Sequence, residues 1–277
     1  MPTTPHTPTA DAGETYRFTR FRTSLLIDDL TFSPDAPAPG DHVPAFDLPV
    51  LDGGRFTSTD LGPRPVLLVF GSRTCPVTES AGPILNTLHR EFGDRARFVL
   101  VNTREAHPGQ HFDQPRTDDE KRRHADELRR HHAVPFEVAV DDLDGGLHRA
   151  MSPKPNSAYL IDSSGVIRFR AHWANDARGL HAALTDIVSG RVPHRDRSRA
   201  MAGPLLRAVG HLPGVVGFAG GRVEREIWLA AAPLALLSRV SRLLFRWLPK
   251  DLRGSAAATS ITAVMVLLVA VAIGVAR

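Results

Sequence analysis

The chain has 277 residues, enough for one domain of ordinary size and a substantial appendage. Its hydrophobic content of 42% and charged content of 23% are typical of a globular protein and exclude a largely disordered one. The single cysteine excludes an internal disulfide and argues against a disulfide-stapled secreted fold.

Charge is unevenly distributed along the chain. From residue 190 onward, 13 Arg or Lys stand against four Asp or Glu, whereas the whole chain has 34 against 30. The body is therefore mildly acidic and the tail is strongly basic. A basic tail indicates contact with an anionic surface, either a membrane leaflet or a nucleic acid.

The first part of the chain leads into a strand–helix unit. Residues 1–36 are rich in Pro, Thr and Asp and predict an irregular arm, with a possible short strand near Thr23–Ile27. The apolar run Pro65–Phe70 predicts a strand buried on both faces. Residues Glu79–Phe92 then predict a helix, in which Pro83 introduces a kink.

Further strands and helices follow in alternation. Arg97–Asn102 and Phe136–Val140 predict two more strands, and the capping box that begins at Thr117 opens a polar helix between them, to about residue 132. The stretches SAYLID and VIRFR predict a hairpin, and Asn175 or Asp176 caps a last helix.

Helical crossovers make strands parallel, and the hairpin adds an antiparallel edge. The sequence therefore predicts an α/β domain over residues 37–190, with a mixed sheet and flanking helices.

The C-terminal segment 256–276 predicts a transmembrane helix. It carries no charge, and ~20 residues at ~1.5 Å each cross a hydrocarbon core of about 30 Å. The alternative is a helix buried in the protein or in an oligomer.

Residues 191–254 predict a basic, amphipathic helical linker that lies at an anionic membrane surface. Its basic face carries Arg239, Arg242 and Arg246. The opposite face is apolar and carries Leu236, Leu237, Val240, Leu243, Leu244, Trp247 and Leu248. A helix packed on the domain is the alternative.

Basic residues crowd before the apolar segment and only Arg277 follows it, so the positive-inside rule predicts a body on the cytoplasmic side. The unpaired cysteine agrees with that side, and the N-terminus shows no secretory signal. We expect no nucleic-acid partner, because the tail has no basic platform interleaved with aromatic residues.

The cysteine, Cys75, follows the strand Pro65–Phe70 at the start of a predicted helix, with Pro76 in the first turn. Unpaired N–H groups and the positive end of the helix dipole stabilise a thiolate there, which predicts a pKa below ~8.5. Ser72 and Thr74 are able to donate hydroxyl hydrogen bonds to the sulfur. The alternative is an inert, buried cysteine.

Glu105 and His107 follow the next strand along the chain, and Pro155 precedes the strand that begins at Ser157. Loops after neighbouring parallel strands meet at the carboxyl edge of a sheet, so these residues should lie near Cys75. An acid and a base beside a thiolate could move protons for a thiol reaction. Each of the two taken alone is also explained as an ordinary loop residue.

These motifs resemble the thioredoxin-fold redoxins (the peroxiredoxin and thiol-specific antioxidant group), and most closely their iodothyronine-deiodinase-like branch. FGSRTCP is similar to the deiodinase stretch in which selenocysteine precedes Pro, so Cys75 matches the selenocysteine. NTREAHP resembles that branch's Glu-Ala-His loop, so Glu105 and His107 match its active-site residues. Pro155 falls at the proline that thioredoxin folds hold in cis, and the resemblance covers roughly Pro37–Ile187.

Together, residues and resemblance predict a membrane-tethered thiol oxidoreductase. Cys75 would attack a small electrophile, such as a peroxide oxygen, an oxidised thiol or a halogen. Thr78 stands where thioredoxins carry a second cysteine, so an external thiol would have to regenerate the enzyme. Glu105 and His107 would handle protons. The thiolate and substrate would be oriented by Ser72, Thr74, Pro76 and Pro155.

Two alternatives remain open: a non-catalytic thioredoxin-fold module that binds a partner at the membrane, and a reductive dehalogenase. No cofactor and no metal are expected.

Overall fold

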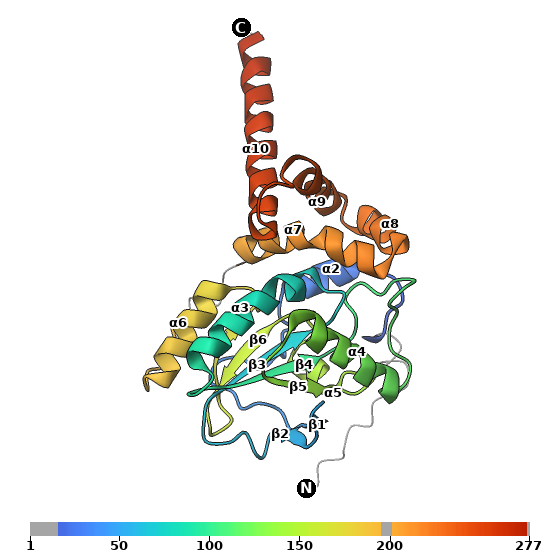
Figure 1. Ribbon diagram of the computed structural model, residues 1–277. Helices are drawn as coiled ribbons and strands as arrows, with labels where there is room; N and C mark the ends of the chain where they lie inside the picture. The colour runs from blue at the N-terminus through green and yellow to red at the C-terminus, as the bar shows by residue number, and fades with distance from the viewer. Residues whose placement is uncertain (1–15, 195–200, 276–277) are drawn as a thin grey trace.

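The computed structural model describes residues 16–194 and 201–275 (Figure 1). Five strands form one sheet in the order β5-β4-β3-β6-β7. These strands are β3 (Val66–Gly71), β4 (Arg97–Asn102), β5 (Glu137–Val140), β6 (Ala158–Ile161) and β7 (Ile167–Ala171). A separate antiparallel pair joins β1 (Asp47–Pro49) and β2 (Arg55–Thr57).

The pairing follows from the connections. β3, β4 and β5 are parallel neighbours because helices join them, whereas β6 runs antiparallel to both β3 and β7. Every residue of β3 is buried, as its unbroken apolar run predicts for a central strand covered on both faces. The predicted mixed α/β sheet with flanking helices is confirmed.

Three helices cover one face of the sheet: α3 (Pro76–Phe92), α4 (Asp118–His132) and α6 (Ala177–Val188). The other face is covered by the β1–β2 pair and by α5 (Gly146–Met151), a short helix that the sequence did not predict. Thr117 caps α4 and Asp176 caps α6, as expected; each side chain accepts a hydrogen bond from a backbone N–H of the first turn.

Four helices form the tail: α7 (Ala202–Ala219), α8 (Gly221–Ala230), α9 (Ala232–Leu244) and α10 (Lys250–Val275). α7 lies across the end of the sheet domain, beside α3 and α2, and α10 projects away from the body (Figure 1). The described residues contain one helical segment, Lys250–Ile273, that is long enough and apolar enough to cross a membrane. The predicted linker therefore consists mainly of the three helices α7, α8 and α9. The helix that was predicted to be amphipathic is α9, which ends at Leu244, before Pro249.

The predicted short strand near Thr23–Ile27 is wrong: Thr23–Leu30 forms the helix α2. A helix satisfies its backbone hydrogen bonds internally and needs no partner strand. It also packs Leu25 and Leu26 against apolar side chains of the tail. The rest of the predicted irregular arm, residues 1–15, lies outside the described residues.

Candidate active site

Cys75 lies just beyond the carboxyl end of β3 and is the N-cap residue of α3, with Pro76 in the first turn. The backbone N–H groups of Val77 and Thr78 and the hydroxyl of Thr78 face the sulfur and lower the thiol pKa, although the Cys75 side chain makes no capping hydrogen bond. The predicted position of the cysteine at a helix start is therefore correct.

The predicted low pKa of the thiol is wrong for this structure. Cys75 is 1% exposed and packs among apolar side chains, including Trp173 and Ala208. A buried thiolate loses its hydration, and this cost exceeds the gain from the N–H and hydroxyl groups of α3, so burial raises the pKa of Cys75 to about 11. The sequence argument counted the helix N–H groups but had no information on the apolar cover.

That cover comes from outside the sheet domain. A cavity of about 80 Å³ lies at Cys75 and is lined by side chains of α2 and α7, among them Leu30 and Leu205. α2 precedes Cys75 by some 45 residues, and α7 follows it by more than 120. Segments from both ends of the chain therefore keep water from the sulfur.

His107 lines the same cavity as Cys75. It is buried against the ring of Phe21, with a centroid separation of 4.5 Å, and its Nδ1 has no hydrogen-bond partner. Burial lowers the pKa of His107 to about 4, so the imidazole is neutral near pH 7. A base with this pKa does not take the proton of a thiol whose pKa is about 11 while both stay buried, so proton transfer to His107 requires that water reach the cavity.

Glu105 is fully buried but does not line the thiol cavity. Its Oε2 accepts hydrogen bonds from the backbone N–H and the hydroxyl of Thr74, at 2.9 and 2.6 Å, and its Oε1 lies 3.1 Å from Nδ1 of His124. The carboxylate thus fastens the Cys75 loop to the neighbouring loop. This geometry suits a positioning residue better than a proton carrier.

The hydroxyl groups of Ser72 and Thr74 also join the two loops. Ser72 Oγ accepts from Ala106 N at 3.2 Å, and Thr74 Oγ1 accepts from His107 N at 3.1 Å. The structure therefore brings the two loops together at the sheet edge, as the parallel strands require. The partners of these two hydroxyl groups are backbone N–H groups, and not the sulfur of Cys75 as predicted.

Thr78 supplies the side-chain hydroxyl that faces the sulfur instead. Its Oγ1 also accepts a hydrogen bond of 3.0 Å from Nδ2 of Asn156, which fixes its position. Sequence reasoning treated Thr78 only as a missing second cysteine. The available signal was its spacing, since a residue three positions after an N-cap lies in the first helical turn.

Lys154 is a second residue that sequence reasoning missed. It is 1% exposed, its Nζ donates to the carbonyl oxygen of Asp29 and lies 4.0 Å from the Trp173 ring, and its charge interacts with Cys75. Burial lowers the pKa of Lys154 to about 8, which leaves most of it charged at pH 7. A buried ammonium near the sulfur would stabilise a thiolate. A lysine in a short polar loop gives no sequence signal of burial.

Pro155 lines the thiol cavity, but the expected cis peptide bond is absent: all peptide bonds in the described residues are trans. Trans is the intrinsically preferred isomer even before proline, by ~0.5–1 kcal/mol.

Residues 39–170, most of the sheet domain, match the AhpC/TSA family. The match agrees with the predicted redoxin and with a thiol-dependent oxidoreductase, but it does not single out the deiodinase-like branch. It covers somewhat less than half of the chain and ends before the helices of the tail begin.

Among solved structures, the chain is similar to an uncharacterized conserved protein from Geobacillus kaustophilus, with 16% identity, a TM-score of 0.47, and coverage of 57% of this chain and 85% of that one. It is also similar to a putative thiol:disulfide interchange protein DsbE from Chlorobium tepidum, with 22% identity, a TM-score of 0.44, and coverage of 55% of this chain and 99% of that one. A third similar structure is the peroxidoxin BcpB from Mycobacterium tuberculosis, with 17% identity, a TM-score of 0.41, and coverage of 53% of this chain and 96% of that one. No curated protein matches this chain.

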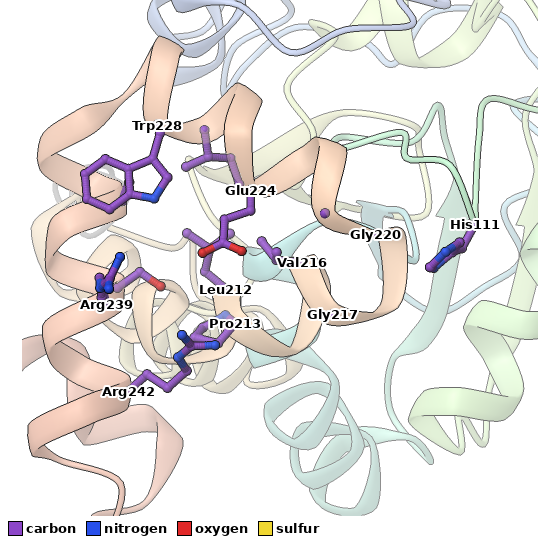
Figure 2. A pocket seen from close by; sticks show the side chains of 14 residues that line it. His111, Leu212, Pro213, Val216, Gly217, Gly220, Glu224, Trp228, Arg239 and Arg242 are labelled. Carbon is purple, nitrogen blue, oxygen red and sulfur yellow. The ribbon is translucent and has the colours of Figure 1, made fainter.

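A second cavity, of about 260 Å³, lies within the tail between α7, α8 and α9. Figure 2 shows Arg239 and Arg242 of α9 beside it, near Glu224 of α8, with Trp228 above. Two of the arginines assigned to the basic face of the linker therefore border a hollow in the tail.

Proposed function

We propose that this chain is a membrane-tethered thiol oxidoreductase in which Cys75 is the one redox-active cysteine and an external thiol regenerates it. The observation that carries the proposal is the placement of Cys75 at the start of α3 in an AhpC/TSA redoxin domain, in one cavity with the neutral imidazole of His107.

The chemistry needs one base and one electrophile. His107 takes the thiol proton, and the sulfur of Cys75 attacks one oxygen of a peroxide. The O–O bond breaks, and the leaving alkoxide takes the proton from His107 to become an alcohol. The attacked hydroxyl stays on the sulfur, so Cys75 is oxidised to a sulfenic acid and the peroxide is reduced. An external thiol then forms a mixed disulfide with loss of water. A second thiol releases Cys75 and leaves as the external disulfide.

Reaction also needs the apolar cover to open. When α2 or α7 moves away, water reaches the sulfur and the desolvation that raises the pKa of Cys75 disappears. The N–H groups of Val77 and Thr78 and the Thr78 hydroxyl stay beside the sulfur, since they belong to α3 itself. An opened site would therefore hold a much larger fraction of thiolate than the covered one.

Membrane attachment is supported by the surface of the tail. Each large apolar residue of α10 between Val264 and Ile273 has more than half of its surface exposed. At the base of α10, α9 packs through small residues such as Ser238 and Ser241 and leaves Leu243 and Leu244 exposed. The basic residues that precede the span favour a redoxin domain on the cytoplasmic side.

Cys75→Ser tests the chemistry. We expect the intact chain, in detergent or bilayer nanodiscs, to form a sulfenic acid with dilute peroxide, trapped by dimedone as a defined mass increase, and to consume peroxide when thiol is supplied. Cys75→Ser should lose both activities. If the wild-type chain forms no adduct in the bilayer, the redox proposal is wrong.

Deletion of residues 256–277 tests the tether. We expect the shortened chain to move from the membrane pellet to the supernatant, because no other described helix is long and apolar enough to span. Retention in a pellet that resists high salt would contradict the anchor.

A non-catalytic binding module is the second candidate, and the buried thiol with its raised pKa is the observation that favours it. The dimedone measurement separates the two, because a binding module would stay unmodified in the bilayer as well as in detergent.

A further inference from the structure

One turn along α3 from Cys75, a cluster of three metal-ligating side chains joins α3 to the end of α4. It consists of Glu79, in the first turn of α3, and His131 and His132, the last residues of α4. Nε2 of His131 lies 2.8 Å from Oε2 of Glu79, and Nε2 of His132 lies 3.8 Å from the same oxygen. One ligand atom from each residue lies within 4.8 Å of the other two.

These distances fit a tetrahedral metal ion. With Zn–N and Zn–O bonds of about 2.0–2.2 Å, two ligands of a tetrahedral centre are about 3.4 Å apart. The observed separations of 2.8 and 3.8 Å lie on either side of this value. For these two pairs a cation would require side-chain shifts of about half an ångström, and the two histidine nitrogens lie within 4.8 Å of each other.

The burial of His132 points independently to a ligand. Its side chain is 6% exposed, and its Nε2 is buried without a hydrogen-bond partner. The ring lies so close to Gly82 of α3 that a Cβ there would come within 2.5 Å of Nδ1, so it has little room to turn away. Buried ring nitrogens normally have a hydrogen-bond partner, and this one lies 3.8 Å from Oε2 of Glu79, too far for a hydrogen bond.

A neighbouring arginine limits the affinity of the three side chains for a metal ion. Arg73 Nη1 lies 3.6 Å from Oε2 of Glu79, so a metal ion must compete with a guanidinium. Arg73 has other partners, since its Nε lies 3.7 Å from Glu127 and its guanidinium stacks 3.9 Å above the ring of Phe218. It can therefore release Glu79 and still stay paired.

We propose that Glu79, His131 and His132 bind a divalent transition-metal ion of the Zn²⁺ class, with water in the fourth position. Two imidazoles and one carboxylate are a donor set that zinc and its neighbours accept, and that Mg²⁺ and Ca²⁺ do not prefer. The ion would cross-link the start of α3 to the end of α4, beside the thiol loop.

The test uses the intact chain in detergent, freed of metal with a chelator, and Co²⁺ as a coloured probe. We expect one equivalent of Co²⁺ to give the visible absorption of a tetrahedral centre, and one equivalent of Zn²⁺ to remove it. Glu79→Gln and His132→Ala should lose the signal. The matched control is His181→Ala, which removes a similar pair, His181 Nε2 to Glu91 Oε1 at 2.9 Å, with no third ligand in the described chain.

Circular dichroism establishes that each variant is folded. If His132→Ala does not fold, His131→Ala decides, because His131 is partly exposed and its loss leaves the packing against Gly82 intact. The proposal is overturned if the wild-type chain gives no tetrahedral signal, or if folded Glu79→Gln binds Co²⁺ as tightly as His181→Ala does.

Discussion

The sheet domain and the segments that cover it act on Cys75 in opposite directions. The domain supplies the groups that favour a thiolate: the first N–H groups of α3, the hydroxyl of Thr78 and the ammonium of Lys154. α2 and α7 supply a mainly apolar cover and the carboxyl group of Asp29, and both favour the neutral thiol. The difference teaches that the reactivity of this thiol depends on the position of elements outside the fold that carries it.

The largest expected effect is the pH dependence of the covered thiol. Because burial raises the pKa of Cys75 to about 11, the thiolate is scarce at pH 7 and its fraction grows tenfold with each pH unit up to that value. Alkylation of the intact chain by iodoacetamide should therefore accelerate by about 1000-fold from pH 7 to pH 10, as followed by mass spectrometry. A rate that levels off by pH 8 would show that the cover does not control the thiol.

Opening the cover should have the next largest effect. Leu205→Gln places an amide above the sulfur, where it must bring water with it. If the pKa then falls from about 11 towards that of a free thiol, alkylation at pH 7.5 should accelerate by up to about 100-fold. Leu229→Gln is the matched control, because Leu229 is 86% exposed on α8, and its rate should equal that of the wild type. Equal rates for both variants would refute control by α7.

Removal of one donor should have the smallest effect. Thr78→Val deletes the hydroxyl that faces the sulfur and leaves the amide of Asn156 without that acceptor. We expect alkylation to slow a few-fold at fixed pH, and stability to fall by about 1–3 kcal/mol in denaturant titrations. Thr87→Val, at an exposed position on the same helix, is the control. A faster rate in Thr78→Val would mean that the hydroxyl does not stabilise the thiolate.

The sequence was informative where short-range patterns decide structure. The apolar run at β3, the capping threonine of α4 and the position of Cys75 at a helix start all follow from neighbours in the chain. It was also sufficient to bring the Glu105 loop to the Cys75 loop, because parallel strands leave their next loops at one edge. The roles of individual side chains at that edge were less predictable. From the sequence, the hydroxyl groups of Ser72 and Thr74 could bond either to the sulfur or to the backbone of the other loop. Only the packed structure shows that they accept hydrogen bonds from that backbone.

By itself, the amino-acid sequence determined the alternation of strands and helices, the place of the one cysteine and the long apolar helix near the C-terminus, since each depends on periodicity or composition within a short window. Only the tertiary structure decided that α2 and α7 meet over the thiol, and that His132 lies against α3 with an unsatisfied nitrogen. The physical reason is desolvation. The pKa of a thiol depends on whatever excludes water from it, and here those side chains are tens to more than a hundred residues away along the chain.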